Sequence, residues 1–102
     1  MKNNHANEQS LPSEDYFLTL YVSGTSPNSL RAINNLTAIC EQYLRGKFTL
    51  EVIDVYQEKL VAKEQQLIAL PLLIKKNPSP TVKLIGDLSE TKKVLKALGI
   101  KE

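Results

Sequence analysis

Apolar runs and helical spacing predict a strand–helix–strand unit in the first half of the chain. The segment Tyr16–Val22 reads YFLTLYV, a nearly continuous apolar run that is typical of a central strand buried on both faces. A helix is predicted next, because Ser26 can cap it, Pro27 suits its first position, and apolar residues at helical spacing continue to Leu44. Gly46 is expected at the left-handed position that ends this helix.

A second strand is predicted over Phe48–Val55, where apolar residues alternate with polar ones and Glu51 occupies an exposed position. Because a helix connects the two strands, they are expected to be parallel with a right-handed crossover.

The second half of the chain predicts a helix followed by a hairpin. The segment Gln57–Ile68 has a narrow apolar stripe and is interpreted as a weaker helix, which Pro71 ends. Leu72–Lys75 and Thr81–Ile85 are two further strands, and the short turn at residues 77–80 makes them an antiparallel pair.

The last helix is expected to start at Asp87 and to end near Leu98. Asp87 can cap it, and Glu90 three residues later completes a capping-box-like pattern. Gly99 supplies the left-handed residue that ends it.

The predicted order of elements is βαβ-α-ββ-α. This order is typical of an α/β, thioredoxin-like fold with a four-stranded mixed sheet and three helices. The loop at residues 24–28 lies where thioredoxins carry their dithiol, and Pro71 lies where they carry a cis proline. Pro71 is therefore a structural cis-proline candidate.

Length and composition are those of one globular domain. The 102 residues include 42% hydrophobic and 24% charged residues, which fits a single core and excludes a wholly disordered chain. Residues 1–15 are expected to be a flexible N-terminal tail, and residues 16–102 the folded domain. No apolar run is long enough to span a bilayer and no apolar signal segment is present, so a cytoplasmic protein without a membrane partner is expected.

Reactive residues are scarce, which argues against an enzyme. One cysteine and one histidine exclude an intramolecular disulfide, a CxxC redox pair and a zinc site, and no cofactor is expected. Thr25 and Asn28 stand where a thioredoxin dithiol would stand, so thioredoxin-type redox activity is disfavoured. Cys40 falls on the apolar stripe of the first helix and is interpreted as a buried, inert thiol.

Four segments carry a closer resemblance. They are LYVSGTSPNSLRAI (Leu20–Ile33), LEVIDV (Leu50–Val55), ALP (Ala69–Pro71) and IGDLSETKKVL (Ile85–Leu95), and in this order they resemble the KaiB family. The resemblance implies a small non-catalytic regulator that binds the hexameric ATPase KaiC and alters its phosphorylation cycle, in a clock-like or stress-adaptation role. It also implies a thioredoxin-like state, which some members reach by refolding their C-terminal half from a different, self-associated fold.

The resemblance further implies a partner-binding surface on the second strand, the second helix and nearby parts of the first helix. In this sequence the matching positions are Arg31, Thr49, Glu51, Lys59, Lys63 and Gln66. Many family members carry lysine where Glu51 and Gln66 stand. The surface offered to a KaiC-like ATPase is therefore expected to have one reversed and one lost charge, which weakens or redirects a charge-matched interface.

The end of the chain bears on which fold is populated. Relatives that switch usually carry glycine after the Val-Leu pair and then an acidic tail, whereas this chain continues Lys96-Ala97-Leu98-Gly99. Alanine in place of glycine favours a helix by about 0.8–1 kcal/mol, so the thioredoxin-like fold is expected as the ground state. A homo-oligomer, either dimer or tetramer, is also expected from the unpaired sheet edge.

An alternative of another class stays open, namely a basic adaptor that binds nucleic acid or an acidic protein. It depends on lysines that gather on the last helix and the hairpin: Lys92, Lys93, Lys96, Lys75, Lys76 and Lys83. A solvated face is the simpler interpretation, and nucleic acid is disfavoured because acidic residues interleave and no exposed aromatic platform accompanies the lysines. A second alternative, close to the regulator, is a KaiB-like sensory domain of a histidine kinase.

Overall fold

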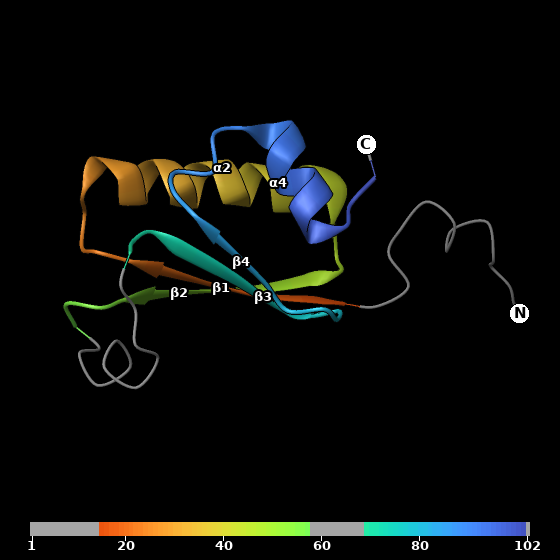
Figure 1. Ribbon diagram of the computed structural model, residues 1–102, viewed down its shortest axis with the longest axis horizontal. Helices are drawn as coiled ribbons and strands as arrows, with labels where there is room; N and C mark the ends of the chain where they lie inside the picture. The colour runs from red at the N-terminus through yellow and green to blue at the C-terminus, as the bar shows by residue number, and fades with distance from the viewer. Residues whose placement is uncertain (1–14, 58–68, 102) are drawn as a thin grey trace, which may run out of the picture.

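The computed structural model describes residues 15–57 and 69–101, which form one sheet with two helices on one of its faces (Figure 1). Along the chain the elements are β1 (Tyr16–Val22), α2 (Pro27–Tyr43), β2 (Phe48–Asp54), β3 (Leu72–Asn77), β4 (Val82–Ile85) and α4 (Thr91–Leu98).

The sheet is mixed and has the strand order β2-β1-β3-β4. β1 and β2 are parallel, from Tyr16 opposite Phe48 to Val22 opposite Asp54. β3 runs antiparallel to both β1 and β4. The parallel pair and the antiparallel hairpin confirm the predicted thioredoxin-like sheet, and they leave β2 and β4 as its two edges.

The start of α2 forms as its sequence predicts. Ser26 Oγ accepts a hydrogen bond from the amide of Ser29 at 3.2 Å, and Pro27 occupies the first helical position, where no amide hydrogen is needed. The helix ends at Tyr43 with Leu44 as its C-terminal cap. Gly46, with a φ of +71°, therefore lies one residue beyond the position predicted for it, because the helix stops a residue earlier.

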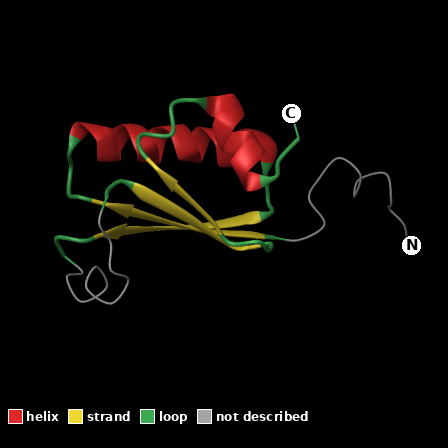
Figure 2. Cartoon of the chain, viewed as in Figure 1, coloured by secondary structure: helices red, strands yellow, loops and turns green. Residues whose placement is uncertain are grey.

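The main core lies between the sheet and the two helices, which cover the same face (Figure 2). Its buried side chains come from every layer: Leu18, Leu20, Leu36, Ile39, Cys40, Leu73, Val94, Leu95 and Leu98 among others. A second cluster lies on the opposite face and contains Tyr21, Val55, Leu72 and Ile74. The central strand β1 is therefore buried on both faces, as its apolar run predicted.

Two helices occur in the described residues, where the sequence predicted three in the whole chain. Gln57 lies in a turn, and the rest of the helix predicted over 57–68 falls outside the described residues. Of the tail predicted over residues 1–15, only Asp15 is described.

The predicted start of α4 is wrong. The helix begins at Thr91, and Glu90 is its N-terminal cap without a side-chain capping bond. Asp87 Oδ1 instead accepts a hydrogen bond from the amide of Ser89 at 3.1 Å, so this carboxylate stabilises a turn ahead of the helix. The predicted end is confirmed, since Gly99 has a φ of +76° and donates its amide hydrogen to the carbonyl of Lys96.

Candidate partner-binding surface

The edge strand β2 carries two of the side chains that were expected to contact a partner. Thr49 and Glu51 are both exposed and lie two residues apart, so they project from the same face of the sheet. They stand opposite Phe17 and Thr19 of β1. Tyr21 lies on the neighbouring strand β1, and its pKa is raised first by burial and then by the negative charge of Glu51.

The end of β2 adds exposed apolar surface that the sequence reasoning missed. Val52 is 43% exposed and Tyr56 is 67% exposed, although both are large apolar or aromatic side chains. Val52 projects from the opposite face of β2 to Glu51, and Tyr56 lies in the turn that follows the strand, so this edge exposes both acidic and apolar side chains. The signal in the sequence was weak, because exposure of single apolar residues is common on folded proteins.

Asp54 links this end of β2 to the loop that follows β1 through side-chain hydrogen bonds. Its Oδ1 atom accepts hydrogen bonds from the amides of Gly24 at 3.1 Å and of Tyr56 at 2.9 Å. Gly24 has a φ of +59°, and a Cβ atom there would lie 3.2 Å from the Tyr56 ring. Both facts favour glycine at this position. The loop is thereby held beside the exposed tyrosine.

Arg31 is placed elsewhere. It lies on α2, where its Nε donates to Asp87 Oδ2 at 3.4 Å and its guanidinium also donates to the side chain of Asn28. Asp87 follows β4, whereas Thr49 and Glu51 lie on β2 at the other edge of the sheet. The structure thus brings Thr49 and Glu51 together and separates Arg31 from them.

Three other expected contact residues, Lys59, Lys63 and Gln66, lie outside the described residues, so their role stays a prediction. Pro71 is described: the Leu70–Pro71 peptide bond is cis, and the residue is buried. Its carbonyl accepts the amide hydrogen of Gly86 at 3.0 Å, which joins the start of β3 to the end of β4.

The redox position of the fold carries no thiol. Thr25 lies in the turn before α2, and Asn28 is the second residue of that helix. Cys40 is fully buried within α2, where burial and then the charge of Glu41 raise the pKa of its thiol to about 12. This confirms the prediction of a buried thiol, and a thiolate that could attack a disulfide is strongly disfavoured there.

Within the two described stretches, no group of three or more His, Cys, Asp or Glu side chains is arranged to hold a metal ion. None of the helices seen in residues 15–57 and 69–101 is long and apolar enough to cross a membrane.

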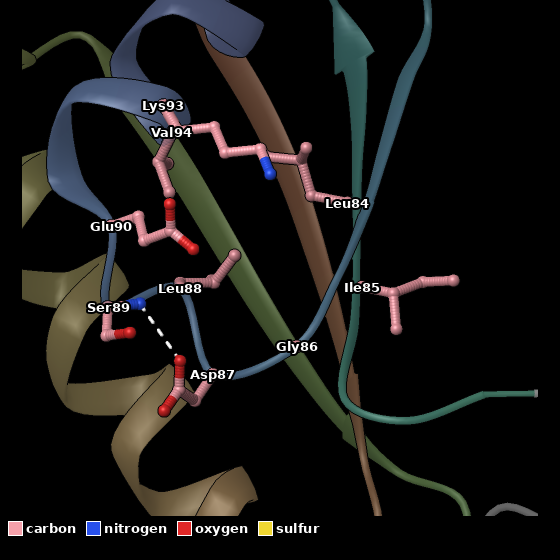
Figure 3. Close-up of a pocket in the computed structure, with 9 residues that line it drawn as sticks. All are labelled: Leu84, Ile85, Gly86, Asp87, Leu88, Ser89, Glu90, Lys93 and Val94. Atoms are coloured by element: carbon pink, nitrogen blue, oxygen red, sulfur yellow. Dashed lines mark hydrogen bonds between the residues drawn. The ribbon is translucent and has the colours of Figure 1, made fainter.

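A pocket of about 200 Å³ opens between β4 and α4 (Figure 3). Leu84, Leu88 and Val94 supply its apolar wall, and the side chains of Glu90 and Lys93 extend along it. Leu84 points toward the helix side and Ile85 points away from the pocket. No local pattern in the sequence predicts this pocket, because it forms only where the strand and the helix come together.

One lysine of the hairpin departs from the expected solvated face. Lys75 is only 3% exposed, because the strand register places it opposite Leu18, which belongs to the main core. Its Nζ lies 5.8 Å from the centre of the Tyr16 ring, a cation–π arrangement that accommodates a charge on a partly apolar surface. Lys76 and Lys83 are exposed, as expected.

Solved structures share this architecture. The N-terminal domain of Synechococcus elongatus SasA superimposes with a TM-score of 0.66 at 23% identity, covering 85% of this chain and 86% of that domain. The oxidised mitochondrial thioredoxin 3 of Saccharomyces cerevisiae gives a TM-score of 0.63 at 17% identity, covering 90% and 87%. These likenesses define the fold: the chain has a thioredoxin-like fold, with Thr25 and Asn28 at the start of α2, where the sequence predicted the dithiol positions.

Sequence similarity then identifies the family. The family model described as the KaiB domain matches residues 19–100, and the chain belongs to the KaiB family. The circadian clock oscillator protein KaiB of Prochlorococcus marinus is 45% identical over 85 residues, covering 83% of this chain and 81% of that protein. The protein of the same name from Gloeothece citriformis is 46% identical over 85 residues, covering 83% and 80%.

Proposed function

We propose that this chain is a non-catalytic clock regulator that binds a KaiC-type hexameric ATPase and alters its phosphorylation or ATPase state. The family match and relatives that carry the name of circadian clock oscillator protein support this role. A protein without chemistry of its own can act in this way by binding one conformational state of the ATPase more tightly, which shifts the population toward that state.

The observation that carries the proposal is the exposed edge strand β2 with Thr49 and Glu51 on one face. An edge strand offers backbone donors and acceptors to a partner, and its exposed side chains set specificity. Lys59, Lys63 and Gln66 are proposed to extend this contact. Arg31 lies apart from these residues and is proposed to act indirectly, by holding the loop that contains Asp87.

Co-elution of the chain with a KaiC homologue tests the proposal. We expect a complex with the ATPase in one nucleotide state, ATP or ADP, and weaker or no complex in the other. Absence of binding in both states would contradict the proposed function.

A pair of charge-reversal variants tests the position of the contact. The resemblance to the family implies lysine at this position in many members, so Glu51→Lys is expected to raise the affinity by about fivefold, since a peripheral ion pair contributes up to about 1 kcal/mol. Lys83→Glu, the matched reversal on the opposite edge strand β4, is expected to leave the affinity unchanged. Equal effects of both variants would place the contact elsewhere.

A further inference from the structure

The outer edge of β4 has backbone groups that are directed away from the sheet. β4 is the outermost strand, and its residues pair with β3 in antiparallel register, with Lys83 opposite Ile74 and Ile85 opposite Leu72. The amide of Gly86 donates to the carbonyl of Pro71, so the Pro71–Gly86 pair is hydrogen bonded. Because bonded and non-bonded pairs alternate in an antiparallel ladder, the amides and carbonyls of Lys83 and Ile85 point outward.

The side chains at this edge alternate between two environments. Leu84 packs against the main core and lines the pocket beside α4, whereas Ile85 is 64% exposed and points away from that pocket (Figure 3). An additional strand along β4 would therefore place every second side chain over the pocket wall made by Leu84, Leu88 and Val94.

The charge around this edge is mainly positive. Lys83 on β4 and Lys93 at the pocket are exposed, and Lys92 and Lys96 follow on α4. Of the two acidic residues that line the pocket, Asp87 is paired with Arg31, which leaves Glu90 against these lysines. A partner with negative charges is therefore favoured.

We propose that the open edge of β4 binds an extended acidic peptide segment as an additional strand. Backbone bonds to Lys83 and Ile85 provide the pairing, and an apolar side chain of the peptide fills the pocket. Its carboxylates stand at the alternate positions and lie near Lys83, on the face of the sheet away from the pocket. A second copy of this chain fits less well, because two β4 edges would bring Lys83 close to its own equivalent. The site is distinct from the β2 edge of the proposed function and does not depend on it.

Amide hydrogen exchange with a defined probe tests the inference. The probe is a blocked heptapeptide of alternating glutamate and leucine, added to the full ¹⁵N-labelled chain. Slower exchange is expected at the outward amides of Lys83 and Ile85, with little change at Val82 and Leu84, whose amides already pair with β3. The same peptide with lysine in place of glutamate is expected to bind at least fivefold more weakly.

Variants separate backbone pairing from charge. Lys83→Pro removes the outward amide and is tolerated on an edge strand, so it is expected to weaken binding about tenfold, whereas Lys83→Gln weakens it about twofold. Lys93→Glu changes a charge beside the pocket, on the opposite face from the carboxylates, and is expected to weaken binding by no more than about twofold. Glu51→Lys is expected to have no effect, which separates this site from the proposed ATPase contact.

Four results would overturn the inference. Two concern the peptide: equal affinity for the lysine and glutamate peptides, or protection from exchange that is confined to another part of the chain. Two concern other partners: tighter binding of a single-stranded oligonucleotide than of the acidic peptide at Lys83 and Ile85, or protection of these amides that rises with protein concentration when no peptide is present. The last two results would assign the edge to nucleic acid or to a second copy of the chain.

Discussion

Tyr16, the first residue of β1, donates its phenolic hydrogen to the carbonyl oxygen of Leu98, the last residue of α4, across 2.9 Å. The two residues are 82 positions apart in the sequence. Burial raises the pKa of Tyr16, so the hydroxyl stays protonated and remains a donor well into the alkaline range. This hydrogen bond joins the end of α4 to the start of β1, a central strand of the sheet.

Tyr16→Phe is expected to lower the free energy of unfolding by about 1–2 kcal/mol, because it leaves the buried carbonyl of Leu98 without this donor. Chemical denaturation measures the loss, and amide exchange should become faster in α4 before it does in α2. Tyr43→Phe, in which the substituted ring lies at the end of α2, is the control. An equal loss in both variants would mean that the hydroxyl of Tyr16 contributes nothing specific.

The thioredoxin-like state is expected to be the ground state. A substitution in α4 tests this expectation, because that helix belongs to the C-terminal half that refolds in some family members. Ala97 lies inside α4 and is half-buried. Ala97→Gly is expected to cost about 1 kcal/mol through helix propensity, and to raise the population of any state in which α4 is not formed. NMR amide spectra of the C-terminal half measure that population.

Ala38→Gly is the matched control, because it places the same change on an exposed position of α2. It should lower stability by a similar amount without new signals from residues 82–100. A wild-type spectrum whose strand register lacks the β3–β4 pairing would contradict the expected ground state.

The pKa of Asp87 is lowered, first by hydrogen bonds from the Ser89 hydroxyl and amide and then by the Arg31 guanidinium. Because the folded pKa lies below the unfolded value, the contribution to stability is present above the unfolded pKa and is lost as pH falls through the folded one. A carboxyl NMR titration should give a midpoint below 3.8. Ser89→Ala should raise it more than Arg31→Gln does, and the reverse order would contradict the assignment.

The thiol of Cys40 is expected to be unreactive in the folded protein, because burial raises its pKa from 9.0 to about 12. A disulfide reagent at pH 8 should label it only after denaturation. Ala38→Cys, which adds an exposed thiol on the same helix, should react at once. Since the folded pKa is raised, the stability from the neutral thiol is complete below the unfolded pKa and is lost as pH rises toward 12. Fast native labelling of Cys40 would revive a redox role.

Local patterns predicted the elements that depend on short-range chemistry. The cap at Ser26, the buried run of β1 and the stop at Gly99 occur as expected, because each depends on residues that are neighbours along the chain. The start of α4 was predicted wrongly, since Asp87 and Glu90 matched a capping pattern but the carboxylate of Asp87 instead accepts the amide of Ser89 and pairs with Arg31.

The sequence by itself determined the order of the strands and of α2 along the chain, the absence of a dithiol at Thr25 and Asn28, and the likeness to one family. Only the tertiary structure decided that Lys75 is buried against Tyr16, that Arg31 pairs across to Asp87 away from Glu51, and that a pocket opens beside β4. The physical reason is distance along the chain. Periodicity and capping act over a few residues, whereas strand register and helix docking bring together side chains that no local pattern connects.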